Sequence, residues 1–199
     1  MMIYRFSRCI GQTLKLTIIA LTAVLTSCQQ QGTHRPIGYH RISFPEKSYD
    51  TLSGNYPFEC LLSRHSTIEK APNSDTNQWY NIVYPKYNAT IHLSYHHIDT
   101  SLSAYTETSR QFAMQHIPKA TAIRQNVVSL PEHSVYGICY NIQGSDAASP
   151  IQFYLTDSTH NFLRGALYFN NTPNNDSVAT VIEYINDDLV VLMESLRWK

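Results

Sequence analysis

The sequence has 199 residues and is formally neutral at pH 7, because 15 lysine and arginine residues balance 15 aspartate and glutamate residues. Only 15% of the residues are charged and no basic patch stands out, which argues against nucleic acid as a partner. The 14 tyrosines favour a domain rich in β-sheet, and the chain is long enough for one domain with a real core.

The first 27 residues are typical of a secretory signal peptide. Arg5, Arg8 and Lys15 give a positive start, and residues 16–27 form an apolar run without charge. This run is too short for a membrane-spanning helix, which needs roughly 20 apolar residues. We therefore expect residues 1–27 to be removed during export.

The leader ends in the letters LTSC, where an aliphatic residue and two small ones precede Cys28. This ending resembles a bacterial lipobox, which implies that the Cys28 thiol is acylated, with palmitate or a similar chain, and becomes the first residue after cleavage. Two or more acyl chains hold a protein stably on a bilayer. We predict a cell-envelope lipoprotein that is anchored to the inner or outer membrane and faces the periplasm, with residues 28–37 as a leash and residues 38–199 as one domain. An ordinary secreted protein is the alternative.

Strand patterns dominate the first half of the predicted domain. Strands are predicted over residues 39–44, 56–62, 78–85 and 89–96. The last two are separated only by the letters KYN, which indicates a hairpin. A helix is predicted next over residues 101–117, with capping residues before it and Pro118 at its end.

The second half of the domain repeats this order. Strands are predicted over residues 134–142, 151–157 and 161–169. The letters STH separate the last two, which indicates a second hairpin. After a loop over residues 170–177, apolar residues from Val178 to Leu196 recur at helical spacing and predict a second helix.

The predicted order is therefore four strands, a helix, about four strands and a helix. Hairpins imply antiparallel pairing, and each helix must bury its apolar stripe on a face of the sheet. We predict an α+β fold in which a mostly antiparallel β-sheet is covered by two helices. The order is similar to a Mog1/PsbP-like arrangement.

Two cysteines remain in the predicted domain, Cys60 and Cys139. An envelope location is oxidising and permits a disulfide between them. Two separate buried thiols are the alternative, and the sequence leaves both open, because it does not show whether the two backbones approach each other.

The nine histidines raise the question of a metal site. His92 and His96 share one face of a strand, but about 13 Å of extended chain separates them, which is too far for one ion. The sequence has no G-x-S-x-G motif for a nucleophile. Cys139 lies within an apolar strand, where a buried thiol is inert. We expect no metal, no cofactor and no enzymatic activity.

Two short patterns match the Asp-Ser/Thr-apolar acceptor that some envelope bacteria O-glycosylate. They contain Thr51 and Ser177. Asp176 and Ser177 are also ideal capping residues for the last helix. Thr51, predicted in a loop, is the better candidate for glycosylation.

Several blocks of the sequence resemble one family. These blocks are GYHRISFPEKSY, WYNIVYPKYNATIHLSY, GSDAASPIQFYLTDSTHNFLRGALYF and the ending ESLRWK. Together they resemble the GldD family of gliding-motility-associated lipoproteins of Bacteroidota, over about residues 38–199. The resemblance implies a role in gliding and in the associated type IX protein secretion system, with other envelope lipoproteins or components of the secretion and gliding machinery as partners. In members from species that do not glide, a role in secretion or envelope assembly is expected.

The resemblance supplies no catalytic motif, so we expect a non-catalytic accessory or scaffold protein. Loops on a rigid sheet often carry function. We select the loop over residues 144–150, with Asp146, and the loop over residues 170–175, with Asn174, as partner contacts; simple connections are the alternative. The competing class is a periplasmic lipoprotein that binds a small molecule or lipid. Its lining would be formed by Tyr80, Tyr84, Tyr136 and Tyr140.

Overall fold

The computed structural model describes residues 42–72, 78–99 and 101–199, which belong to one compact unit. Its centre is a seven-stranded sheet with the strand order β4-β5-β6-β10-β9-β8-β7, and every neighbouring pair is antiparallel. The strands are β4 (Thr67–Lys70), β5 (Gln78–Tyr84), β6 (Ala89–His97), β7 (Ala122–Leu130), β8 (Val135–Gln143), β9 (Ile151–Thr156) and β10 (Asn161–Phe169).

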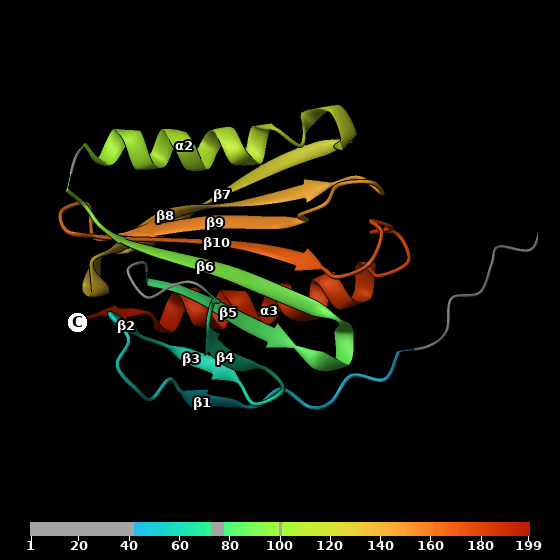
Figure 1. Ribbon diagram of the computed structural model, residues 1–199, viewed down its shortest axis with the longest axis horizontal. Coiled ribbons are helices and arrows are strands. Elements are labelled where there is room, and N and C mark those ends of the chain that lie inside the picture. The colour runs from blue at the N-terminus through green and yellow to red at the C-terminus, as the bar shows by residue number, and fades with distance from the viewer. Residues whose placement is uncertain (1–41, 73–77, 100) are drawn as a thin grey trace, which may run out of the picture. The chain divides into compact units, whose positions relative to one another are not determined.

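Two helices cover opposite faces of this sheet (Figure 1). They are α2 (Leu102–Met114) and α3 (Ala179–Ser195). Two small pairs of strands lie beside the sheet: β1 (Tyr49–Thr51) with β3 (Leu61–Ser63), and β2 (Phe58–Glu59) with β11 (Arg197–Trp198). The predicted α+β fold with an antiparallel sheet and two helices is thus confirmed. Within the described ranges, neither helix is long and apolar enough to cross a membrane.

Alternation along the strands divides the interior into two cores. The larger core lies between the sheet and α3, where Ile82, Ile91 and Leu163 meet Ile185 and other residues of the helix. The smaller core lies under α2 and is built from Tyr140, Ile142, Tyr154, Phe162 and Ala113. α3 is the longer and more apolar helix and buries seven residues against two in α2, so it packs on the larger core.

Two of the connections between the long strands have the same chemistry. β5 and β6 are joined by the letters PKYN, and β7 and β8 by PEHS. In each, proline starts a single 3₁₀ turn, and the fourth residue, Asn88 or Ser134, adopts a left-handed conformation with φ of 50° or 51°. Its backbone N–H donates to the proline carbonyl, which closes the hairpin.

Some predicted elements differ from the structure. Of the predicted strand 39–44, residues 39–41 lie outside the described ranges, and residues 42–44 are not a strand. The segment 56–62 is divided at Cys60, because β2 pairs with β11 whereas β3 pairs with β1. The long strand β7 was not predicted as an element, because its exposed edge position removes the apolar alternation that marks a strand.

A buried carboxylate on α3 joins the N-terminal segment to the sheet. The Asp188 side chain is only 2% exposed. It accepts hydrogen bonds from Lys47 Nζ at 2.7 Å, Tyr49 Oη at 3.0 Å and Tyr84 Oη at 3.1 Å. Burial and the hydrogen bond to Asp188 raise the pKa of Tyr49 to about 12, so its hydroxyl remains a donor. Lys47 Nζ also lies 3.6 Å from the centre of the Tyr184 ring. One carboxylate therefore connects α3, β5 and residues 47–49.

We predict that Asp188→Ala is strongly destabilising, because it leaves Lys47 without its buried counter-charge and the Tyr49 and Tyr84 hydroxyls without their acceptor. Removing one partner of a buried ion pair costs about 3 kcal/mol of unfolding free energy. Asp187→Ala is the matched control, because Asp187 is 62% exposed and its carboxylate lies 3.9 Å from Lys47 Nζ, farther than that of Asp188 at 2.7 Å. This variant should change the free energy of unfolding by less than about 0.5 kcal/mol. Urea unfolding of both variants measures the difference, and equal losses would contradict the role of Asp188.

The β9–β10 hairpin is closed by Asp157. Its Oδ1 accepts the backbone N–H groups of Thr159, His160 and Asn161 at 2.9, 2.8 and 2.8 Å. Burial alone would raise the pKa of Asp157, but these N–H donors together lower it to about 2. Ser158, inside this turn, has φ of 70°. The turn therefore depends on an ionised carboxylate.

We predict that Asp157→Ala lowers stability at pH 7 and that the difference from wild type shrinks on acidification. The folded pKa of about 2 lies below the ordinary value of 3.8, so the stabilisation is complete above pH 4 and is lost as pH falls towards 2. Asp157 is only partly buried, so the effect should be of the order of 1 kcal/mol. Chemical unfolding between pH 2 and 7 measures it, with exposed Asp146→Ala as the control; a difference independent of pH would exclude this role.

Candidate functional site

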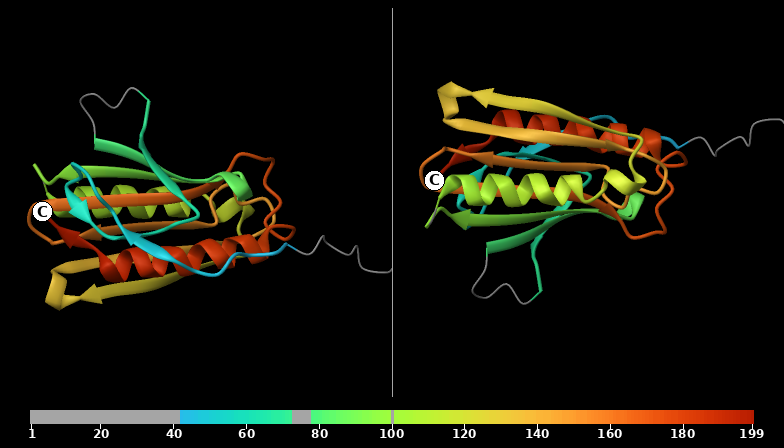
Figure 2. Two further views of the ribbon diagram at one scale, coloured as in Figure 1. Left: turned by 90° about the horizontal axis from the view of Figure 1, so that it is seen from below. Right: turned by 90° about the horizontal axis from the view of Figure 1, so that it is seen from above.

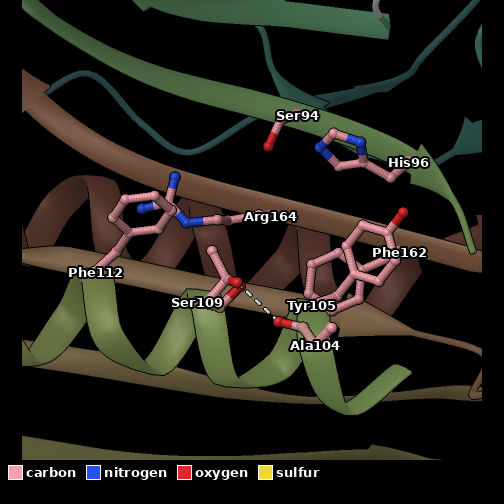
Figure 3. Close-up of a pocket in the computed structure, with 9 residues that line it drawn as sticks. Ser94, His96, Ala104, Tyr105, Ser109, Phe112, Phe162 and Arg164 are labelled. Carbon is pink, nitrogen blue, oxygen red and sulfur yellow. Dashed lines mark hydrogen bonds between the residues drawn. The ribbon is translucent and has the colours of Figure 1, made fainter. Parts of the chain in front are cut away.

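A cleft lies between α2 and the face of the sheet that it covers (Figure 3). Its volume is about 320 Å³, and we call it the α2 cleft. It is lined from β6, β10 and α2 by Ser94, His96, Ala104, Tyr105, Thr108, Ser109, Phe112, Phe162 and Arg164. Thr108 Oγ1 donates to the Ala104 carbonyl at 2.8 Å, so its hydroxyl is already used within the helix.

Arg164 supplies the charge of the α2 cleft. Its Nη2 donates to Gln152 Oε1 at 2.9 Å, and its guanidinium carbon lies 4.5 Å from the centre of the Phe112 ring. No aspartate or glutamate of the described residues forms an ion pair with it. Burial lowers the pKa of Arg164, but a guanidinium stays charged at neutral pH. A partly desolvated cation without a carboxylate partner makes the cleft favourable for an anion.

The other wall of the α2 cleft is aromatic. Phe162 lies 5.3 Å from Tyr105 and 5.4 Å from Tyr154, measured between ring centres. His96 lies 5.6 Å from Tyr105, and burial lowers its pKa, although Asp99 opposes this shift. His96 is therefore neutral at pH 7. The cleft combines one cation with apolar ring surfaces, which suits a ligand with an anionic head and an apolar body.

A second candidate surface joins the two loops selected from the sequence, and we call it the loop pair (residues 144–150 and 170–178). Asn175 is 8% exposed. Its Nδ2 donates to the carbonyls of Gly144 and Ala147, both at 2.8 Å, and its backbone N–H donates to the Ser145 carbonyl at 2.9 Å. The loops therefore lie side by side at one end of the sheet (Figure 2).

A groove of about 510 Å³ adjoins the loop pair. Its apolar lining includes Ile142, Pro150 and Ile182. Asp146 and Asn174 are both exposed on the loops, as a contact role requires. Asn175, which the sequence did not single out, holds them together; an asparagine within an asparagine-rich loop gave no separate signal.

The tyrosine lining proposed for a ligand site is wrong. Tyr80 and Tyr84 are buried in the core under α3, whereas Tyr140 is buried in the core under α2. Residues on opposite faces of one sheet cannot line a common cavity. Arg164 was missed, although a charged residue within the otherwise apolar strand NFLRGALYF is a recognisable signal.

The remaining predicted residues have varied outcomes. Cys60 and Cys139 are free and buried, so the disulfide is wrong and the alternative of two separate thiols is what the structure has. Burial raises the pKa of the Cys60 thiol to about 12 and of the Cys139 thiol to about 11, which makes both unreactive. Thr51 is exposed but lies in β1, opposite Leu61, and not in a loop. Cys28 lies outside the described residues.

Comparison with known proteins identifies the family. The family model described as "Gliding motility lipoprotein GldD" matches residues 29–198. The chain belongs to the GldD family. It is therefore a lipoprotein, anchored to a membrane of the cell envelope, with a role in gliding motility. The search of curated proteins gave no match.

This GldD-family protein also resembles solved structures. One of them is the solution structure of cyanobacterial PsbP (CyanoP) from Synechocystis sp. PCC 6803. It has 10% sequence identity and a TM-score of 0.47, and the match covers 83% of this chain and 100% of that chain.

No group of three or more potential metal ligands lies together within the described ranges.

Proposed function

We propose that this GldD-family protein is a non-catalytic scaffold component of the type IX secretion apparatus associated with gliding. Acylated Cys28 holds it on the inner or outer membrane, and the folded domain faces the periplasm. The loop pair is the observation that carries the proposal. Three hydrogen bonds from buried Asn175 give two separate connections one fixed shape, which a recognition surface needs and a simple chain reversal does not.

The chemistry of the loop pair defines the kind of partner. Asp146 and Asp176 are exposed and acidic, and the adjoining groove is partly apolar. A partner that inserts an apolar side chain between basic residues complements this surface. Such a partner belongs to the envelope lipoproteins or to the secretion and gliding machinery.

Because of the lipid anchor, weak contacts are sufficient for association with a membrane-bound partner. A protein held on a membrane meets other membrane-bound partners at a high effective concentration. The contacts of Lys47 and Tyr49 with Asp188 fasten the segment that follows the leash to α3. The leash therefore limits how far the loop pair can reach from the bilayer.

We predict that replacing Asp146 and Asn174 together by tryptophan lowers type IX secretion and gliding without lowering the amount of folded protein. Bulky rings on the exposed loops would block docking, while Asn175 still holds the loop pair together. Glu69→Trp, an exposed change on β4 at the far edge of the sheet, is the control. Secretion is measured by assay of the culture medium and gliding by colony spreading. Normal secretion and spreading in the double variant would show that the loops are simple connections.

Ligand binding is the second candidate function, and Arg164 favours it. A half-buried guanidinium without a carboxylate partner lies over the Phe112 ring in the α2 cleft (Figure 3). The ligand class is a small carboxylate with an apolar body. The site is the α2 cleft, and it replaces the site lined by four tyrosines that was expected from the sequence.

We predict that 4-phenylbutanoate binds the full-length protein and that Arg164→Gln weakens this binding at least about tenfold, the value of one charge-assisted hydrogen bond. The uncharged comparator 4-phenylbutanol should bind as weakly to wild type as the carboxylate does to the variant. Arg110→Gln, on the exposed face of α2, is the matched control and should bind like wild type. Ligand-observed NMR measures the affinities. Equal binding of acid and alcohol, or an equal loss in both variants, would exclude the α2 cleft as a carboxylate site.

A further inference from the structure

The strand β7 ends the sheet with an edge that no described strand covers. It has nine residues, of which only Arg124 is charged, and Val127 is 79% exposed. The opposite edge, β4, has four residues and carries Glu69 and Lys70. Natural sheets shield their edges by short strands and charged residues. β4 has both features, and β7 is long and almost uncharged, as an edge that pairs with another chain would be.

The hydrogen bonds of β8 show which backbone groups of β7 face outward. The Ile142 N–H donates to the Pro150 carbonyl at 2.8 Å, that is, towards β9. The N–H and C=O of one residue point to the same side of a strand, and the side alternates from residue to residue. The odd-numbered residues of β8 therefore bond β7, and by the register Cys139 opposite Asn126 they meet even-numbered partners. The unpaired outward groups belong to Ile123, Gln125, Val127 and Ser129.

We propose that β7 pairs in an antiparallel manner with β7 of a second copy of this chain, centred on Asn126. This register aligns all nine residues of both strands. It places Ile123 opposite Ser129 of the second copy and Gln125 opposite Val127 of the second copy. Each of these residues has outward N–H and C=O groups, so the pairing forms about eight hydrogen bonds between the copies. A register shifted by one residue would place outward groups opposite inward ones.

The side chains agree with this register. Asn126 meets Asn126 of the second copy, and an amide can both donate and accept. Arg124 comes opposite Val128 and not opposite another arginine. Val128 lines a groove between β7 and α3 that also contains Val190 and Glu194. Glu194 therefore offers a negative charge on the side where Arg124 of the second copy enters.

The arrangement of the helices leaves room for the second copy. α2 lies over the middle of the sheet and not over β7, whereas α3 lies behind the β7–β8 hairpin (Figure 2). The membrane anchor confines both copies to one surface, which raises their effective concentration. This pairing is independent of the partners proposed for the loop pair.

Cysteine crosslinking of full-length protein in intact cells tests the pairing. In Asn126→Cys, the two thiols occupy a pair without backbone bonds, with Cα atoms about 4.5 Å apart, which permits a disulfide. We expect a dimer-sized band after oxidation with diamide. In the control Ser129→Cys, the two thiols lie about 20 Å apart in this register and should give at least tenfold less dimer. The native Cys60 and Cys139 are buried and do not interfere.

A second substitution distinguishes pairing of the two β7 edges from crosslinking by random collision of two copies on the membrane. Val127→Pro removes an outward N–H but leaves the hydrogen bonds between β7 and β8 intact. Added to the Asn126→Cys variant, it should abolish the crosslinked dimer. The unfolding midpoint should stay near that of the Asn126→Cys parent. Val127→Lys, which places a charge on the edge, should act in the same way if proline disturbs the fold. Three outcomes would overturn the proposal: equal dimer from both cysteine positions, dimer that persists in both the Val127→Pro and the Val127→Lys variants, or a crosslink only to a protein of another size.

Discussion

The buried carboxylate of Asp188 is the interaction on which the arrangement of the domain depends. It lies in the middle of the longer helix and gathers donors from the N-terminal segment and the sheet. An ionised group can be buried only if it is neutralised and fully hydrogen-bonded, and Lys47 with two tyrosines meets both conditions. The same contacts hold residues 47–49 against α3.

The two faces of the sheet differ in how completely a helix covers them. The α3 face is filled by a continuous core that extends from Leu52 to Leu196. The α2 face has a smaller core, and the shorter helix leaves the α2 cleft beside Arg164 and lies over the middle of the sheet, not over β7 (Figure 2). Every candidate interaction surface is thus found where the packing of helix on sheet is incomplete: at the cleft, at the loop pair and at the free edge.

Local patterns in the sequence predict much of this fold. The two hairpins around KYN and STH and the helix from Val178 are recognisable because each has strong periodicity and clear turn residues. β7 is not, because an edge strand exposed on both sides needs no apolar alternation. Lys47 and Asp188 are 141 positions apart, and only the folded chain brings them together. Arg164 and Asn175 are similar cases, since their roles depend on contacts with other segments.

The position of Asp188 also determines how mechanical tension would enter the protein. A gliding cell exerts drag on its surface, and a lipid-anchored domain receives such a load through its amino-terminal side. Because Lys47 and Tyr49 bind Asp188 near the midpoint of α3, the pull reaches the helix that packs on the largest core as well as the short strand β1, which begins at Tyr49. The domain is thereby suited to bear load between the bilayer and whatever it binds.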